Sequence, residues 1–189
     1  MKGIEAVVIG TSAGGVQALL EILPELPADF PAPILAVVHI PADRSNVLAP
    51  LFSRKCRISA REAEDKEAAV PGVVYFAPSD YHLLVEANGD LALSYEEHIN
   101  FSRPSIDVLF ESAADTYREG LLAILLTGAN DDGARGLAAV AAAGGHVIVE
   151  DPATAYARAM PEAGLKFCPT AQVENLQGIV EQLRAIATP

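Results

Sequence analysis

The chain has 189 residues, is 51% hydrophobic and carries a formal net charge of −12, with 25 acidic against 13 basic side chains. This length and apolar content fit one domain with a large core, which we expect to span residues 1–189. The acidic balance disfavours nucleic acid and anionic membranes as partners, and no apolar run approaches the roughly 18 residues of a membrane span. The two cysteines, Cys56 and Cys168, are too few for a disulfide scaffold or a cysteine metal site, so we expect a reducing, cytoplasmic compartment.

The first predicted element is a buried strand that runs into the glycine-rich turn Gly10–Gly15 and then into a helix. Within the turn, Ser12 lies in a G-x-S-x-G pattern, which exposes a serine at a sharp bend between strand and helix. The helix start offers free N–H groups to a negative charge beside that hydroxyl. Tight turns of this kind are also common without any catalytic role, so the motif alone leaves both interpretations open.

Strands and helices alternate along the rest of the chain. Apolar residues at helical spacing follow the Ser12 turn until Pro24 and Pro27 end the segment. Continuous apolar runs, typical of parallel strands covered on both faces, alternate with amphipathic segments. We expect strands over residues 34–40, 73–77, 121–127 and 146–149, helices over about 46–55, 105–119, 134–143 and 176–186, and a loop over the charged stretch 57–72. Ser45 or Asn46 is expected to cap the helix that ends near residue 55.

Asn88 and Gly89 separate two apolar segments, residues 83–87 and 90–94, and form the strongest hairpin signal in the chain. A hairpin within an alternating chain is an insertion or an extension of the sheet. We therefore predict an α/β fold, with a doubly wound, mostly parallel sheet in a three-layer α/β/α sandwich and an inserted β-hairpin.

Polar residues follow three of the predicted parallel strands. Ser12, His39 and the pair Asp131–Asp132 each come directly after a strand, and ligands of open α/β sheets bind at this edge. A histidine can take the proton of a serine hydroxyl, and a carboxylate can fix the tautomer of that histidine. Backbone N–H groups of residues 13–15 and 128–130 could form an oxyanion hole. Each residue alone is more often structural, but together they favour a serine hydrolase.

The other histidines and the competing motifs carry less weight. His82 and His98 fall in or beside the hairpin and are expected on the surface, while His146 begins a strand and lies at the wrong edge of the sheet. The order Ser, His, Asp differs from that of α/β-hydrolases. G-T-S-A-G-G is not a dinucleotide fingerprint, and His39 stands where an acidic ribose ligand would be expected.

Seven short blocks along the chain are jointly similar to one known family. They are Gly10–Gly15, Val38–Pro41, Arg61–Asp65, Pro71–Pro78, Arg103–Phe110, Leu126–Ala134 and Ala159–Pro161. Over nearly the whole chain, they resemble the catalytic domain of the bacterial chemotaxis protein-glutamate methylesterases, the CheB family.

This resemblance implies hydrolysis of glutamate γ-methyl esters on the cytoplasmic helices of chemoreceptors, with release of methanol and with glutamine deamidation as a side activity. It implies a catalytic triad of Ser12, His39 and Asp132. Alignment of the T-G-x-x-x-D-G-A block prefers Asp132 over Asp131. No metal or organic cofactor is implied, and the expected oxyanion and substrate contacts are Ala13, Gly14, Ala129 and Arg103.

Two departures from the family pattern keep a second hypothesis open. Ala13 replaces a frequent threonine, and Ala129-Asn130 replaces a usual Met-Gly. The alternative is a regulatory or binding module that keeps the fold with weak or no esterase turnover. Family members also usually carry an N-terminal receiver domain, which nothing in this chain resembles. We therefore expect either a stand-alone protein, with a separate receiver-domain regulator as its partner, or one domain of a longer protein.

Three expectations concern the geometry of the site. Neighbouring side chains point in different directions, so we expect Asp132 to face His39 and Asp131 to be solvated. The rim around Ser12 is expected to be open, with no segment of the chain packed over it. Docking of an acidic protein substrate would need local positive charge, and the candidates are Arg44, Arg103, Arg135 and Arg158.

Overall fold

A computed structural model describes residues 3–40, 47–100 and 102–187 of the chain. Its centre is a seven-stranded sheet in the order β3-β4-β2-β1-β7-β8-β9, and all neighbouring strands are parallel. The strands are β1 (Ala6–Thr11), β2 (Ile34–Val38), β3 (Ser59–Glu62), β4 (Val73–Phe76), β7 (Leu121–Leu125), β8 (His146–Glu150) and β9 (Gln172–Glu174). The chain builds outward from β1 on one side and then returns to β7 on the other. The strand order therefore reverses between β1 and β7, where a doubly wound sheet opens its ligand crevice.

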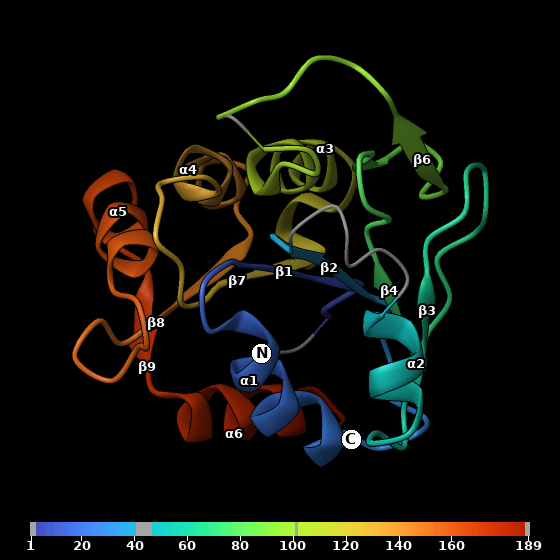
Figure 1. Cartoon of the computed structure of the whole chain (residues 1–189), viewed down its shortest axis with the longest axis horizontal. Coiled ribbons are helices and arrows are strands. Elements are labelled where there is room, and N and C mark those ends of the chain that lie inside the picture. The colour runs from blue at the N-terminus through green and yellow to red at the C-terminus, as the bar shows by residue number, and fades with distance from the viewer. Residues whose placement is uncertain (1–2, 41–46, 101, 188–189) are drawn as a thin grey trace.

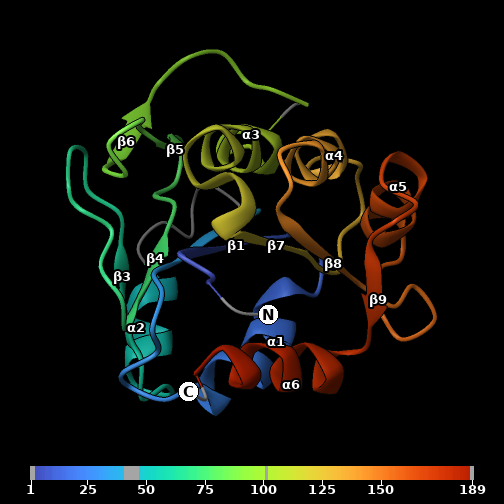
Figure 2. The ribbon, with the colours of Figure 1, turned by 180° about the vertical axis from the view of Figure 1, so that it is seen from behind.

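Helices cover both faces of the sheet, as Figures 1 and 2 show from opposite sides. One face carries α1 (Gly15–Ile22), the short 3-10 helix η1 (Leu23–Glu25), α2 (Leu48–Ser53) and α6 (Leu176–Ala187). The other face carries α3 (Ile106–Tyr117), η3 (Arg118–Gly120), α4 (Ala134–Ala142) and, toward the β9 edge, α5 (Ala159–Phe167). Among the described residues, no helix combines the length and the apolar character that a membrane crossing requires.

The alternation of side chains along the strands explains why the predicted strands read as unbroken apolar runs. In β1, Val7 and Ile9 belong to the core beneath α1 and α6, whereas Ala6 and Val8 belong to the core beneath α3 and α4. Both sets are fully buried because the sheet has helices on each side. This three-layer arrangement confirms the predicted fold class.

The predicted hairpin is present as β5 (His82–Val85) and β6 (Leu91–Ser94), which pair antiparallel around Asn88-Gly89. Gly89 has a φ of 88°, a left-handed conformation that a glycine adopts without strain. The hairpin forms a separate two-stranded sheet over α3, and the N–H of Val85 donates to Ser112 Oγ at 3.1 Å. It is therefore an insertion and not an extension of the main sheet.

Three elements were not predicted. Strand β3 lies within the stretch expected to be a loop, and β9 and α5 were not anticipated. Both strands form edges of the sheet, where half of each strand faces solvent and polar residues are tolerated. The proposed caps Ser45 and Asn46 lie outside the described residues.

Candidate active site

Ser12 and His39 are neighbours because of the pairing between β1 and β2. The register joins Thr11 to Val38, and the N–H of His39 donates to the carbonyl of Thr11 at 3.0 Å. One further step along this parallel register places Ser12 beside His39, at a strand spacing of about 4.8 Å. Both residues are half-buried and come directly after the strands, at the edge where the crevice opens.

Asp132 lies in the loop between β7 and α4, and its carboxylate is held by the start of α3. The backbone N–H groups of Ile106 and Asp107 donate to it at 2.7 and 3.2 Å, and Ser105 Oγ donates at 2.8 Å. Asn100 Nδ2 adds a fourth hydrogen bond at 3.0 Å. The carboxylate therefore caps the free N–H groups of α3, a position that also favours negative charge.

The buried carboxylate contacts His39 directly. Asp132 Oδ2 lies 3.0 Å from His39 Nε2, and the two side chains are 0% and 13% exposed. The Nε2–H direction is not aligned well enough to complete a linear hydrogen bond, so the contact is electrostatic at this geometry. Burial raises the pKa of Asp132, but the contact with His39 and the hydrogen bonds from the Ile106 N–H, Asn100 and Ser105 outweigh it and hold the pKa below its usual value.

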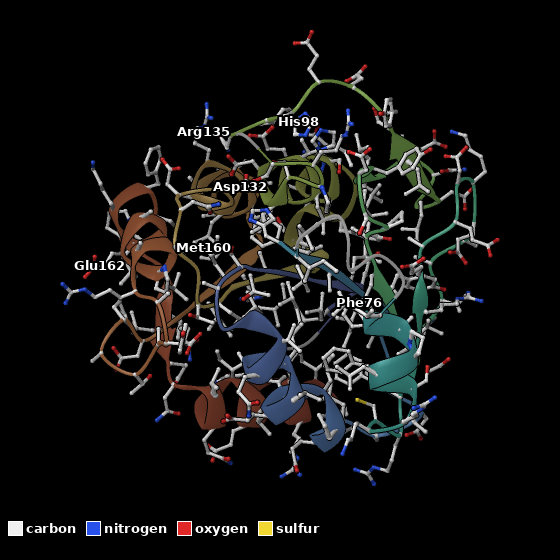
Figure 3. The ribbon with its side chains drawn as sticks, viewed as in Figure 1. Phe76, His98, Asp132, Arg135, Met160 and Glu162 are labelled. Carbon is white, nitrogen blue, oxygen red and sulfur yellow. The ribbon has the colours of Figure 1, made fainter. Side chains whose placement is uncertain are left out.

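The structure brings Asp132, and not Asp131, to the histidine. Asp131 is exposed, and its backbone carbonyl accepts the N–H of Ala134 at the start of α4. Figure 3 shows Asp132 inside the molecule near α3 and α4, with Arg135 and Glu162 pointing outward. Gly133, which follows, has a φ of 92° and lets the loop turn sharply into the helix.

Asn130 contacts the other nitrogen of the imidazole. Its Nδ2 lies 3.4 Å from His39 Nδ1, and its Oδ1 accepts the N–H of Asp132 at 3.3 Å. An amide N–H can donate to Nδ1 only when that nitrogen carries no proton. The contact thus matches the tautomer whose proton sits on Nε2, facing Asp132. The sequence marked Asn130 as a departure from the family pattern but did not predict this contact.

The turn around Ser12 has several polar groups with no partner in the described part of the chain. Among the described residues, the hydroxyl of Ser12 has no hydrogen-bond partner, and the N–H groups of Ala13, Gly14 and Ala129 donate to none. Gly14 has a φ of 83° and begins α1, so the turn bends sharply here. A cavity of about 380 Å³ borders the turn at Gly14 and Thr127. These free donors are what an oxyanion hole requires.

The rim is uneven in how far it is covered. Asn100, from the segment after β6, seals the carboxylate of Asp132, and Tyr156 packs against Gly14 although its own side chain is largely exposed. Ser12, Ala13 and Gly14 stay half-buried. The covered part of the rim is therefore the side of the acid.

Arg103 has a different role from the one expected of it. Its Nε and Nη2 donate to Asp80 Oδ1 at 3.0 and 2.7 Å, and its Nη1 donates to the carbonyls of Tyr95 and Glu96. The guanidinium lies 3.8 Å from the centroid of the Tyr95 ring, and the side chain is only 9% exposed. These contacts occupy the guanidinium. Arg103 therefore fixes the segment after β6 to Asp80, and in this structure its charge is already paired.

The other docking candidates differ from one another. Arg135 is exposed and donates through Nη2 to Asn100 Oδ1 at 2.9 Å, which connects it to the residue that seals Asp132. Arg158 is exposed and its Nε lies 3.5 Å from Glu162. Arg44 lies outside the described residues.

The prediction that His82 lies on the surface is wrong. It is 2% exposed, its Nδ1 accepts the N–H of Ser105 at 3.1 Å, and its Nε2 lies 3.0 Å from the carbonyl of Glu97. The hairpin places it under the segment after β6, where both ring nitrogens find partners. His98 is exposed, as expected, and His146 starts β8 at the opposite edge of the sheet, also as expected.

Sequence reasoning missed two further groups that shape the site. Asn100 donates to both Asp132 and Asp107. Because Asn100 and Asp132 are 32 positions apart, no local sequence pattern predicts this contact. Ser105 was expected only as part of a helix start, yet its hydroxyl bonds to Asp132. Among the described residues, no group of three or more histidine, cysteine or carboxylate side chains gathers as a metal site would require.

A serine beside a histidine that contacts a buried aspartate, at the switch point of a doubly wound sheet, is the combination of residues that serine hydrolases use. Comparison with known proteins gives the family. The model of the CheB methylesterase family matches residues 7–183, and the chain belongs to that family. This membership confirms the family predicted from the sequence, its association with chemotaxis and the enzyme class, a carboxyl-ester hydrolase.

Individual relatives support the same assignment. A protein of Leptospira interrogans is 45% identical over 177 residues, which cover 94% of this chain and 92% of that protein. The protein-glutamate methylesterase/protein-glutamine glutaminase 2 of Caulobacter vibrioides is 42% identical over 85% of this chain, but the match spans only 47% of that relative. The crystal structure of the Thermotoga maritima CheB methylesterase catalytic domain aligns with a TM-score of 0.92 at 37% identity, covering 97% of this chain and 98% of that one.

Proposed function

We propose that the protein hydrolyses glutamate γ-methyl esters on methylated chemoreceptors or related sensory proteins, releases methanol, and deamidates some glutamines at the same site. The names of the relatives, protein-glutamate methylesterase/protein-glutamine glutaminase, support this substrate class. The observation that carries the proposal is the 3.0 Å contact of the buried Asp132 with His39, next to the unbonded hydroxyl of Ser12.

In the proposed reaction, His39 Nδ1 takes the proton of the Ser12 hydroxyl while Asp132 steadies the imidazolium through Nε2. Ser12 Oγ attacks the ester carbonyl, and the free N–H groups of Ala13, Gly14 and Ala129 are the candidates to stabilise the oxyanion. Collapse of the tetrahedral intermediate breaks the bond to the methoxy oxygen, which leaves as methanol with the proton from His39. A water molecule, activated by His39, then hydrolyses the acyl-enzyme. Every catalytic group in this scheme is a residue of the chain.

The partners follow from this chemistry. The substrate ester is carried by a cytoplasmic helix of another protein, so we propose a cytoplasmic enzyme that docks on a protein surface. A receiver domain is the proposed regulator.

One observation favours the alternative of a binding module with weak turnover. Asn130 Nδ2 faces His39 Nδ1, the atom that must accept the proton of Ser12. If that amide does not give way, the fold and the recognition of the receptor could persist without efficient hydrolysis.

Methanol release from a receptor fragment methylated with a radiolabelled methyl group distinguishes the two functions. We expect release by the wild-type protein and none above background by Ser12→Ala. Wild-type protein that binds the fragment but releases no more methanol than Ser12→Ala would establish the binding module instead.

A further inference from the structure

We propose that Glu150 is a positioning residue for the esterase reaction, acting through the peptide of Thr127 on both the Ser12 turn and the loop that carries Ala129. The inference rests on the proposed function, because it concerns the geometry of the same site. It was not visible in the sequence, since residue 150 lies far along the chain from Ser12.

Glu150 is the last residue of β8, and its side chain is almost completely buried, at 2% exposed. The backbone pairing between β7 and β8 ends one residue earlier, at Leu125 and Val149. Beyond this point, Glu150 Oε2 accepts the N–H of Thr127 at 2.8 Å. The side chain thus continues the hydrogen bonding of the sheet where the backbone ladder stops.

Thr127 in turn is bonded to the nucleophile turn on three successive residues. Its carbonyl accepts the N–H of Ser12 at 2.9 Å and the hydroxyl of Thr11 at 2.8 Å. Its own hydroxyl donates to the carbonyl of Ala13 at 2.8 Å and accepts the N–H of Ala157 at 2.8 Å. A displacement of Thr127 would therefore move the backbone on both sides of the Ser12 side chain.

Thr127 also begins the loop that leads to Ala129. The next residue, Gly128, donates its N–H to the carbonyl of Ala157 and accepts the N–H of Met160, both at 3.0 Å. There is no room for a side chain at Gly128, because a Cβ there would lie 2.6 Å from the end of Met160. The free N–H of Ala129 is thus fixed relative to Thr127, and the reacting carbonyl would lie between Ala129 and Ser12.

The Glu150 side chain is needed for its acceptor oxygen and not only for its volume. Burial raises the pKa of its carboxyl, the Thr127 N–H lowers it, and the charges of Glu21 and Asp151 raise it again. An apolar side chain of similar volume would avoid this cost but would leave the buried Thr127 N–H without an acceptor. The acceptor oxygen is therefore the feature that the position requires.

The test compares variants that keep or remove this acceptor. Glu150→Met removes it at similar volume, and Glu150→Gln keeps a carbonyl oxygen of the same reach. On a methylated receptor fragment, we expect Glu150→Met to lower kcat about ten- to hundredfold with KM changed less than about twofold, which corresponds to about 1.4 to 2.7 kcal/mol of transition-state stabilisation. Glu150→Gln should restore kcat to within about threefold of wild type, and Glu181→Ala, an exposed carboxylate on α6, should change nothing.

Amide hydrogen exchange, followed by NMR in the same variants, gives a readout that does not depend on turnover. Glu150→Met should accelerate exchange at Thr127 and at Ser12, while Glu150→Gln should leave both slow. A wild-type protein without esterase activity would contradict the proposed function. The exchange rates would still test whether Glu150 affects the backbone at Ser12.

Three outcomes would overturn the inference. Folded Glu150→Met with wild-type kcat would show that the position is dispensable. Equal losses in Glu150→Met and Glu150→Gln would show that the acceptor oxygen is not what matters. Unchanged exchange at Ser12 beside a lowered kcat would show that Glu150 acts by another route. If Glu150→Met does not fold, Thr127→Val, which loses only the hydroxyl bonds to Ala13 and Ala157, tests the second step, from Thr127 to the Ser12 turn, against Thr127→Ser; wild-type kcat in Thr127→Val would overturn that step.

Discussion

The two sides of the site are built in opposite ways. On the acid side, Asp132 is completely buried, and its carboxylate receives four hydrogen bonds besides its contact with His39. On the Ser12 side, the backbone of Ser12 is held by Thr127, but within the described part of the chain its hydroxyl and the neighbouring N–H groups have no hydrogen-bond partner. The comparison shows that the carboxylate, whose position has to stay fixed, is held by many hydrogen bonds. The groups that must meet a substrate are positioned through their backbone and left without partners, so no existing bond has to be broken before the substrate binds.

The largest effect in this comparison is expected from the fixed acid. In Asp132→Asn the amide would present N–H groups to donors and favour the wrong tautomer of His39, so we expect kcat to fall about 10⁴-fold. Asp131→Asn, a matched change one residue away on an exposed side chain, should stay within about twofold of wild type. Methanol release at saturating substrate measures both, and similar losses in the two variants would contradict the assignment of Asp132.

The hydrogen bonds to the Asp132 carboxylate should also affect the pH dependence of the free energy of unfolding. Because the folded-state pKa of Asp132 is depressed, its contribution is complete above the unfolded pKa of about 3.9 and is lost as the pH falls through the folded value. Asp107 and Glu150 have raised pKa values, so their contributions run the other way and decline as the pH rises from the unfolded toward the folded value.

Urea unfolding between pH 2 and 6 tests the contribution of Asp132. The wild-type free energy of unfolding should fall on acidification below about pH 4, and Asp132→Asn should show a smaller fall over the same range. Parallel curves for the two proteins would mean that Asp132 does not gain its stabilisation from the ionised form.

A smaller effect is expected where the two sides meet, at Asn130. Asn130→Gly deletes the long contact to His39 Nδ1, which leaves that nitrogen to Ser12, and it also deletes the weak 3.3 Å bond from the N–H of Asp132 to Asn130 Oδ1. A neutral hydrogen bond of this kind is worth about 1 kcal/mol, so kcat should rise by up to about fivefold. Steady-state kinetics check the change, and a fall of more than tenfold would show that the amide assists turnover instead of competing with the serine.

The smallest effects are expected from the exposed arginines on the rim. Arg135→Ala and Arg158→Ala should raise KM for the receptor fragment by no more than about fivefold at low salt, and the effect should vanish at high salt. Arg57→Ala, an exposed arginine beyond α2, is the matched control. A change in kcat that persists at high salt for Arg135→Ala would instead point to its contact with Asn100.

Features of the molecule that depend on local sequence could be predicted, and features that depend on distant contacts could not. Strands β1, β2 and β7 could be recognised because helices cover both of their faces, and Ser12, His39 and Asp132 could be grouped because each follows such a strand. The edge strands β3 and β9 could not be recognised, since their exposed halves tolerate polar residues.

What the sequence could not reveal depends on segments that fold back from far away. His82 is buried where Glu97 and Ser105 bond to its ring, and Asn100 and Ser105 reach Asp132 across 32 and 27 positions. The bond from Arg103 to Asp80 could not be predicted for the same reason, since Asp80 lies 23 residues earlier. Such contacts are set by tertiary structure and leave no periodic trace.

The most direct test of the account is whether Ser12 is the nucleophile and His39 its base. Labelling with a fluorophosphonate, which modifies activated serines, followed by mass spectrometry of the digested protein, needs no knowledge of the natural substrate. We predict one adduct, on the peptide that contains Ser12, forming at the wild-type rate in Asp131→Asn and about a thousandfold more slowly in His39→Gln and Asp132→Asn. An adduct on another residue, or an equal rate in His39→Gln and wild type, would contradict the account.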